Sequence, residues 1–394
     1  MTTNLVGKRP DNIWKNMMID NIQSVPVNIP LLDGREEAWL LEAIRTGWIS
    51  SEGPFVQQFE EQFSGKIGRK FGIAVSSGTA ALDIAVRALG IGPGDEVILP
   101  SFTIISCAAA VVRAGAKPVF VDACPDTWNM DVAQIEAQIT SKTKAIMPVH
   151  IYGLPVDMDP LCELAERYKL KIIEDAAEAH GLQYKARNCG TFGDLSIFSF
   201  YPNKLITTGE GGMILTDDED LAERCKSLRN LCFQPQRRFI HEELGFNYRM
   251  TNLQAAVGLG QLERWDQFIE RKQKMGKRYT ELLSGVKGMQ IPLAETPYAQ
   301  NVYWVYGIVL DESVGMDACA AMEKLKGFKI GTRPFFWPMH EQPVFREMGI
   351  IDDRASFPVA ERLARRGFYI PSGLGLTEQK VIYVADKVKE ILDC

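Results

Sequence analysis

The sequence is poor in the features typical of membrane, nucleic-acid-binding and exported proteins. It contains no apolar run of about 18 residues, the length that a membrane-spanning helix needs. Residues 1–10 lack the continuous apolar core of a secretion signal, so we expect no signal peptide. Lysine and arginine total 44 against 50 acidic residues, which gives a net charge of −6, and no long basic run occurs. We therefore expect neither a membrane nor a nucleic acid as a partner.

Closely spaced cysteines and paired histidines are also missing. The eight cysteines are scattered without short paired spacings, which predicts reduced thiols and a cytoplasmic location. The four histidines, at positions 150, 180, 241 and 340, include no pair four residues apart. The sequence therefore gives no support for a zincin-type metal site, and we predict no metal.

The glycine-rich motif that binds dinucleotide cofactors is also absent. Gly90, Gly92 and Gly94 resemble one, but the last glycine is misplaced and the segment precedes a strand instead of following it, so we interpret it as a turn. This argues against a Rossmann-type oxidoreductase. The carboxylates at 217–220 lack the alternating spacing of a cation-binding loop, and we interpret them as a solvated helix start.

The chain does contain regular alternation of short apolar runs with segments of helical period. At 394 residues with 46% hydrophobic and 24% charged side chains, it has the composition of an ordinary globular protein. Seven predicted strands with crossover helices indicate an α/β fold built on a mostly parallel sheet covered on both faces. We predict strands at 72–76, 95–100, 117–122, 144–149, 170–174, 195–200 and 212–216, and helices near 79–89, 103–114, 157–168 and 219–228.

The pattern of predicted elements changes after about residue 260. A long charged helical segment, running from Gln261 to Leu282, leads into shorter mixed elements. We predict an N-terminal arm at residues 1–30 that packs on something else, such as a second subunit. A large domain at 31–262 and a smaller C-terminal α/β domain at 263–394 would follow.

Lys204 is the most informative residue. It follows the predicted strand 195–200 and precedes the turn Gly209–Gly212, and these neighbouring elements are too close for a helical crossover, so it lies on a loop. An amine that loses solvent tends to lose its proton and can then form a Schiff base with a carbonyl. The ordinary alternative is a solvated surface lysine.

Two distant segments supply what a pyridoxal phosphate cofactor needs. An apolar strand breaks at Ser77, Gly78 and Thr79 into a helix, which places hydroxyl and free N–H groups at a positive helix N-terminus and makes an anion site. A buried-type strand at 170–174 leads directly into Asp175, at the sheet edge where ligands bind, and an ionised Asp175 can pair with the pyridine nitrogen. Each signal alone is compatible with simple helix capping.

These residues resemble the DegT/DnrJ/EryC1/StrS family of nucleotide-sugar aminotransferases, which have the aspartate aminotransferase fold (fold type I). The resemblance covers about residues 25–390, and within the family the chain is most similar to the perosamine synthases. The motifs that carry it are Ser77–Ala80, Glu174–Ala177, Ser199–Lys204, Gly209–Gly212 and Gly245–Arg249, with Thr46–Ser51 and Thr332–His340 for the subgroup.

The resemblance implies three catalytic residues. Lys204 forms the Schiff base with pyridoxal 5′-phosphate and shuttles the proton, and Asp175 pairs with the pyridinium nitrogen. Glu178 occupies a position that contacts the phenolic oxygen of the cofactor, commonly Gln in the family but Glu in members like the perosamine synthases. Such a residue adds a titratable group beside Lys204.

The resemblance also implies a cofactor cradle shared between two subunits. The backbone of Gly78 and Thr79, beside Ser77, holds the phosphate together with the Ser199 hydroxyl. Asn247 reaches the same phosphate from the neighbouring subunit. The active unit is then a homodimer with shared active sites.

Other positions are expected around the ring and the substrate. The family usually has an aromatic side chain two positions after Phe102, where this chain has Ile104, so either Ile104 or Phe102 covers the cofactor ring. Arg333 and His340 resemble positions near the sugar nucleotide.

The implied activity is the transfer of an amino group from L-glutamate to a 4-keto-6-deoxy nucleotide sugar. The perosamine resemblance favours conversion of GDP-4-keto-6-deoxymannose to GDP-perosamine, with a UDP- or dTDP-linked keto sugar as the alternative. A deoxysugar dehydratase has a histidine in place of the lysine, so Lys204 argues against it. A non-catalytic regulator that binds pyridoxal phosphate also stays open, although no DNA-binding extension is evident.

Overall fold

The computed structural model describes residues 24–234, 236–352 and 354–392. Its centre is a seven-stranded sheet in the order β1-β9-β8-β5-β4-β2-β3, in which β9 alone runs antiparallel to its neighbours. This confirms the mostly parallel sheet. Its strands are β1 (Phe71–Val75), β2 (Glu96–Pro100), β3 (Lys117–Val121), β4 (Thr143–Ile146), β5 (Lys171–Asp175), β8 (Leu195–Ser199) and β9 (Gly212–Thr216).

The strands are mostly apolar because helices cover both faces of the sheet. One face packs on α4, α5 and α7, and the other packs on α3, α6 and α8. The helices are α2 (Glu36–Thr46), α3 (Pro54–Ile67), α4 (Gly78–Ala88), α5 (Ile105–Arg113), α6 (Met158–Tyr168), α7 (Glu219–Arg229) and α8 (Asn252–Leu262). None of the helices in the described ranges combines the length and the apolar character needed to span a bilayer.

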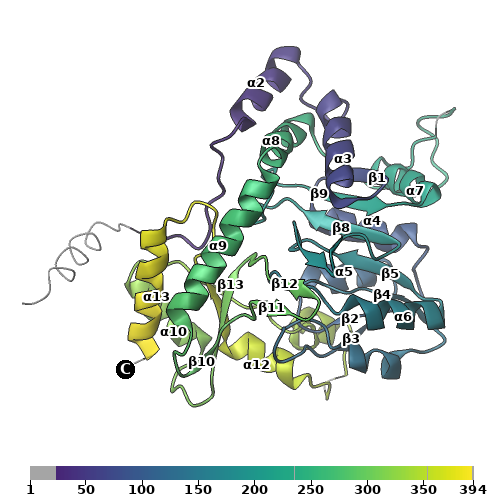
Figure 1. The fold of residues 1–394 in the computed structure, drawn as a ribbon. Helices are drawn as coiled ribbons and strands as arrows, with labels where there is room; N and C mark the ends of the chain where they lie inside the picture. The colour runs from purple at the N-terminus through teal and green to yellow at the C-terminus, as the bar shows by residue number, and fades with distance from the viewer. Residues whose placement is uncertain (1–23, 235, 353, 393–394) are drawn as a thin grey trace, which may run out of the picture.

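A second, smaller sheet forms the C-terminal part of the molecule, in the order β10-β13-β15-β14. Its elements have a core of their own beside the large sheet (Figure 1). They are β10 (Met289–Gln290), β13 (Tyr306–Leu310), α10 (Ala318–Gly327), β14 (Arg333–Pro334), α11 (Pro343–Glu347), α12 (Pro358–Arg366), β15 (Gly367–Ile370) and α13 (Glu378–Leu392). Short hairpins, β6 (Gln183–Tyr184) with β7 (Arg187–Asn188) and β11 (Glu295–Thr296) with β12 (Ala299–Gln300), lie in loops.

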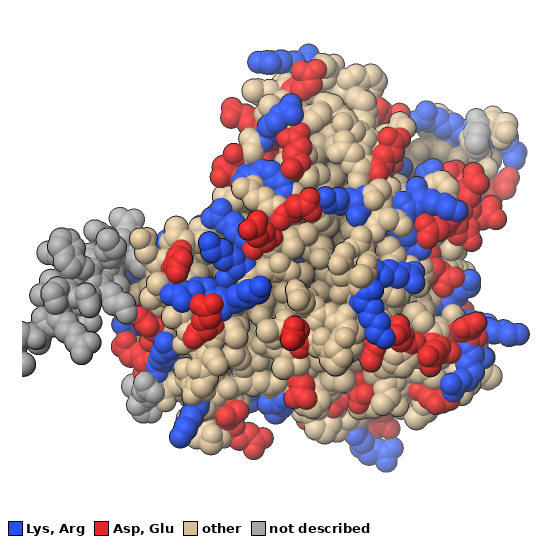
Figure 2. Space-filling view, in the orientation of Figure 1, with Lys and Arg blue, Asp and Glu red and all other residues tan. Residues whose placement is uncertain are grey.

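Helix α9 (Trp265–Leu283) joins the two parts, as Figure 1 shows. Phe268 in its first half belongs to the core of the large sheet, whereas Tyr279 in its second half belongs to the core of the small sheet. Basic and acidic side chains are interspersed over the face drawn in Figure 2, as expected of solvated surfaces. The predicted segment from Gln261 is in fact two helices, because α8 ends at Leu262 before α9 begins.

Part of the predicted arm lies within the described residues. Val25 pairs in parallel with Ile330, and the backbone N–H of Ser372 donates to Val27. Residues 24–30 therefore lie against the small sheet of the same chain. Residues 1–23 lie outside the described residues, and the domain limits stay a prediction.

Candidate active site

A cavity of about 330 Å³ lies at the carboxyl ends of β1, β2, β5 and β8. Because these four strands run parallel, their ends meet at one edge of the sheet, where open α/β sheets bind ligands. A volume of this size is sufficient for a small cofactor. The predicted residues that line it are Ser77, Gly78, Thr79, Ile104, Asp175, Glu178, Ser199 and Lys204.

One end of the cavity is formed by the first turn of α4. Ser77 caps this helix, since its hydroxyl accepts a hydrogen bond from the Ala80 N–H at 3.1 Å. Gly78 allows the turn to lie close to β8, because a Cβ there would lie 2.9 Å from the Cβ of Ser199. The helix N-terminus and nearby hydroxyl groups form a cradle for an anion.

Asp175 forms the other end, at the last residue of β5, where only 2% of it is exposed. Its carboxylate accepts hydrogen bonds from the Cys107 thiol at 3.1 Å and from the Ala177 N–H at 3.0 Å. Burial raises the pKa of Asp175, against the lowering effect of these hydrogen bonds and of the positive charge of Lys204. A cationic ring nitrogen beside this carboxylate would favour its ionised form.

Lys204 lies between these ends, on the loop from β8 to β9, which confirms its predicted place in the fold. Its side chain is 10% exposed, and burial lowers the pKa of its amine. The amine lies 3.6 Å from Glu178, whose pKa burial raises to about 7 although the charge of Lys204 opposes that shift. The backbone N–H of Tyr152 donates to the second oxygen of Glu178 at 3.0 Å.

Aromatic side chains that the sequence analysis did not assign to the site close the cavity. Trp304 lies with its ring centroid 3.9 Å from the Lys204 amine, and its indole N–H donates to the Asn203 carbonyl at 2.9 Å. Phe336 and Tyr369 also line the cavity. These residues lie at least a hundred positions from Lys204, so no local pattern could indicate them.

Five predicted residues need a separate description, because four of them lie outside the lining of this cavity and the fifth, Ile104, stands where the family usually has an aromatic residue. Phe102 is fully buried against Phe335 and Phe336, whereas Ile104 is 41% exposed and faces the cavity. Asn247 is exposed and pairs through its backbone with Asn230.

His340 is buried, and its ring contacts Ser101 at 2.8 Å and Glu361 at 3.0 Å. Arg333 is exposed and lines a second cavity of about 210 Å³, which shares Tyr201, Asn203, Trp304 and Tyr369 with the first. The roles of Arg333 and His340 stay predictions.

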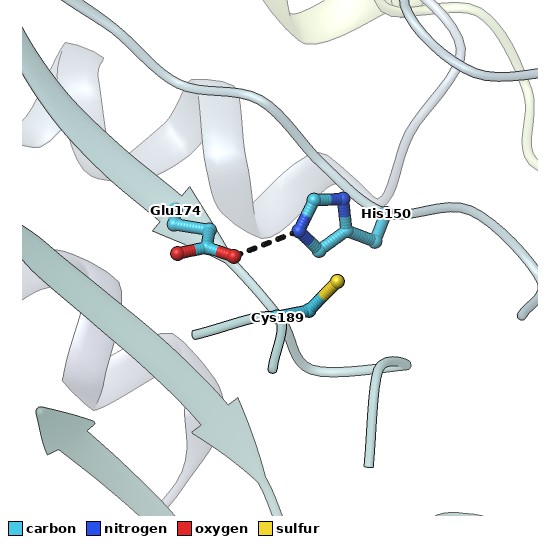
Figure 3. A group of neighbouring side chains, drawn as sticks. All are labelled: His150, Glu174 and Cys189. Carbon is cyan, nitrogen blue, oxygen red and sulfur yellow. Dashed lines mark hydrogen bonds and ion pairs between the residues drawn. The ribbon is translucent and has the colours of Figure 1, made fainter. Parts of the chain in front are cut away.

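A buried group of His150, Glu174 and Cys189 lies beside Asp175 (Figure 3). The imidazole contacts Glu174 at 2.9 Å, and its other nitrogen accepts the Val156 N–H at 3.1 Å. Both Glu174 oxygens also accept hydrogen bonds from backbone N–H groups. Burial alone would raise the pKa of Glu174, but these hydrogen bonds and the contact with His150 lower it. The polar atoms of His150 and Glu174 are satisfied within the protein, so these two side chains stabilise the end of β5.

The residues of the cavity fit pyridoxal phosphate. The cradle at Gly78 offers N–H and hydroxyl donors for a phosphate, Asp175 offers a carboxylate for a ring nitrogen, and Lys204 offers a largely buried amine between them. No rearrangement of the strands is needed to bring the three groups to one cavity.

Comparison with known proteins identifies the family. The DegT/DnrJ/EryC1/StrS aminotransferase family matches residues 30–389. The GDP-perosamine synthase of Caulobacter vibrioides is 42% identical to this chain, and the match covers 95% of this chain and the whole of that protein. The GDP-perosamine synthase of Escherichia coli O157:H7 is 41% identical, and the match covers 93% of this chain and 98% of that protein.

Solved structures of aminotransferases support the same family assignment. The aminotransferase TlmJ from Streptoalloteichus hindustanus superposes with a TM-score of 0.87 at 30% identity, covering 94% of this chain and 99% of its own. Both the sequence match and the superposition extend over nearly the whole chain. The chain therefore belongs to the DegT/DnrJ/EryC1/StrS aminotransferase family and is a pyridoxal phosphate-dependent sugar-nucleotide aminotransferase.

Proposed function

We propose that this protein transfers the amino group of L-glutamate to GDP-4-keto-6-deoxymannose and so makes GDP-perosamine. Relatives named GDP-perosamine synthase, from three organisms, are 37–42% identical over at least 93% of this chain. The observation that carries the chemistry is the buried Lys204 amine between the cradle at Gly78 and the carboxylate of Asp175.

Each residue of the cavity has a distinct task. Pyridoxal phosphate supplies an aldehyde that carries the amino group and a ring that accepts electrons. Ser77, Gly78, Thr79 and Ser199 would bind and orient the phosphate, and Asp175 would keep the ring nitrogen protonated. Ile104, which is exposed to the cavity, would cover the ring where the family usually has an aromatic residue.

Lys204 holds and moves the proton. Burial lowers the pKa of its amine, so the neutral form, which can accept a proton, is accessible nearer to physiological pH. Glu178, at 3.6 Å, can stabilise the charged form when it is ionised. Trp304 covers the amine and excludes water from it.

The substrate would enter through the second cavity. It shares four residues with the first and contains Arg333, an exposed guanidinium suited to the diphosphate of a sugar nucleotide. His340, buried on Ser101 and Glu361, would act on the substrate only through its neighbours.

A homodimer with shared active sites is part of the proposal. A cluster of exposed apolar side chains on and after α2, including Ile44 at 60% and Trp48 at 48%, suits a subunit interface. Asn247, exposed in its own chain, would complete the phosphate cradle of the partner. A cytoplasmic location agrees with the free thiols of the described cysteines.

Lys204→Ala tests the central assignment. We expect this variant to fold, because Lys204 belongs to none of the hydrophobic cores of the two sheets, but to lose the absorbance at about 400 nm that the lysine-bound cofactor gives. Turnover of keto sugar with glutamate should be abolished. Normal turnover in the variant would disprove the assignment, and a regulator would show the absorbance in the wild type without turnover.

The nucleotide carrier is tested by a matched assay. A transaminase of Streptomyces venezuelae that is named for a dTDP sugar is 36% identical over 86% of this chain, which makes a dTDP- or UDP-linked keto sugar the second candidate. With glutamate as donor, we expect GDP-4-keto-6-deoxymannose to give the higher kcat/KM by at least about tenfold. A higher value for the dTDP or UDP substrate would reverse the proposal.

A further inference from the structure

Lys272 is a buried lysine on the helix that joins the two sheets. It is 5% exposed, whereas Lys274 and Lys277 on the same helix are exposed. Its amine donates hydrogen bonds to the carbonyl of Trp304 at 2.6 Å and to the carbonyl of Ser372. No carboxylate within the described ranges forms an ion pair with it. The amine is therefore held by main-chain carbonyls that flank β13 and β15 of the small sheet.

The position is costly for a lysine. Burial lowers the pKa of Lys272 to about 7, because charging an amine away from water is unfavourable. An apolar side chain would avoid that cost and still fill the space. A lysine at this position therefore indicates that the hydrogen bonds of its amine have a function.

Trp304 connects Lys272 to the active site. Its carbonyl is held by Lys272, its indole N–H is held by the carbonyl of Asn203, and its ring lies 3.9 Å from the Lys204 amine. The segment before it is irregular, with Tyr303 at a φ of 50°, so no strand fixes the ring. A cavity of about 10 Å³ between Lys272, Trp304 and Glu178 shows how near Lys272 lies to the catalytic groups.

We propose that Lys272 is a positioning residue that fixes the ring of Trp304 on the amine of Lys204. It makes this contact across the junction of α9 with the small sheet, so the placement of the two sheets and the environment of Lys204 are coupled. A ring held on the amine stabilises its charged form and excludes water. The inference depends on the proposed role of Lys204.

The test compares holoenzymes by the pH dependence of the cofactor's visible absorbance. Lys272→Met removes the donors at similar volume, Trp304→Leu removes the ring but keeps the carbonyl, and Lys277→Met is the matched control on the same helix. We expect Lys272→Met and Trp304→Leu to shift the midpoint in the same direction by about half a pH unit or more, and the double variant to shift no further. Lys277→Met should retain the wild-type midpoint.

Kinetics give a second readout. Lys272→Met should lower kcat about tenfold with little change in KM for glutamate, because it disturbs the catalytic amine and not the binding of the donor. If Lys272→Met does not fold, Lys272→Gln keeps N–H donors without the charge and should give a smaller shift in the same direction as Trp304→Leu.

The outcomes separate the two proposals. A wild-type midpoint in Lys272→Met, or in Trp304→Leu, overturns the positioning role, as do shifts that simply add in the double variant. If the wild type has no absorbance that depends on Lys204, the proposed function itself fails.

Discussion

At the scale of single residues, Glu178 determines how the site responds to pH. Its side chain is 7% exposed, and burial raises its pKa to about 7, with the charge of Lys204 opposing the shift. As pH rises through about 7, the carboxyl group ionises and then favours the charged form of the Lys204 amine. A glutamine keeps the acceptor for the Tyr152 N–H but has no such transition.

Glu178→Gln should therefore remove one inflection from the pH profile. We expect kcat/KM for glutamate to have an inflection near pH 7 in the wild type and none there in the variant, with kcat changed by less than about tenfold. The measurement is a pH series with both proteins in the same buffers. An unchanged inflection would assign it to another group.

The same residue makes the stability of the cofactor-free protein depend on pH. The ordinary pKa of a glutamate is 4.5, whereas that of Glu178 in the folded chain is about 7, so between these values the folded chain binds more protons than the unfolded chain. The contribution of Glu178 to stability is thus complete below pH 4.5 and declines as pH rises through 7. The melting temperature of Glu178→Gln, relative to that of the wild type, should rise between about pH 5 and 7.5. A difference in melting temperature that stays constant with pH would contradict this.

At the scale of elements, the anion cradle depends on how closely β9 approaches the start of α4. A Cβ on Gly212, the first residue of β9, would lie 2.5 Å from the carbonyl oxygen of Ser77. That atom belongs to the backbone and cannot rotate away. The cradle therefore requires glycine at this strand end, although nothing about its own φ demands one.

Gly212→Ala should consequently displace the first turn of α4. We expect the affinity for pyridoxal phosphate to fall by at least about tenfold, measured by titration of the cofactor-free protein. Gly65→Ala is the control, because a Cβ there meets nothing within 4 Å and an alanine in α3 favours the helix. Equal affinities in the wild type and Gly212→Ala would show that the cradle tolerates the shift.

At the scale of the whole molecule, the shared site can be tested by mixing two defective proteins. Asn247 lies outside the lining of its own cavity, so the proposed dimer places it in the partner's site. A Lys204→Ala subunit paired with an Asn247→Ala subunit then contains one intact site and one doubly defective site.

Subunit exchange between the two inactive or weakened variants should restore activity to about a quarter of the wild-type value. The measurement is turnover after mixing and re-equilibration, with each variant alone as the control. No recovery in mixtures that contain verified heterodimers would place Asn247 in its own chain's site, or in none.

The sequence by itself determined the elements and the chemistry that each one carries. The seven strands lie within three residues of their predicted limits, and Lys204 lies on its predicted loop, because apolar runs and turn residues act over a few neighbouring positions. Asp175 at the end of β5 and the cradle at Gly78 could be predicted for the same reason. A parallel sheet then brings strand ends together.

Only the tertiary structure decided how the site is closed. Trp304 reaches Lys204 from a hundred residues away, Lys272 on α9 holds the Trp304 carbonyl, and Phe102 lies buried while Ile104 faces the cavity. Such contacts depend on how the two sheets pack against each other. Packing sums many weak, long-range interactions, so no local pattern of residues records its result.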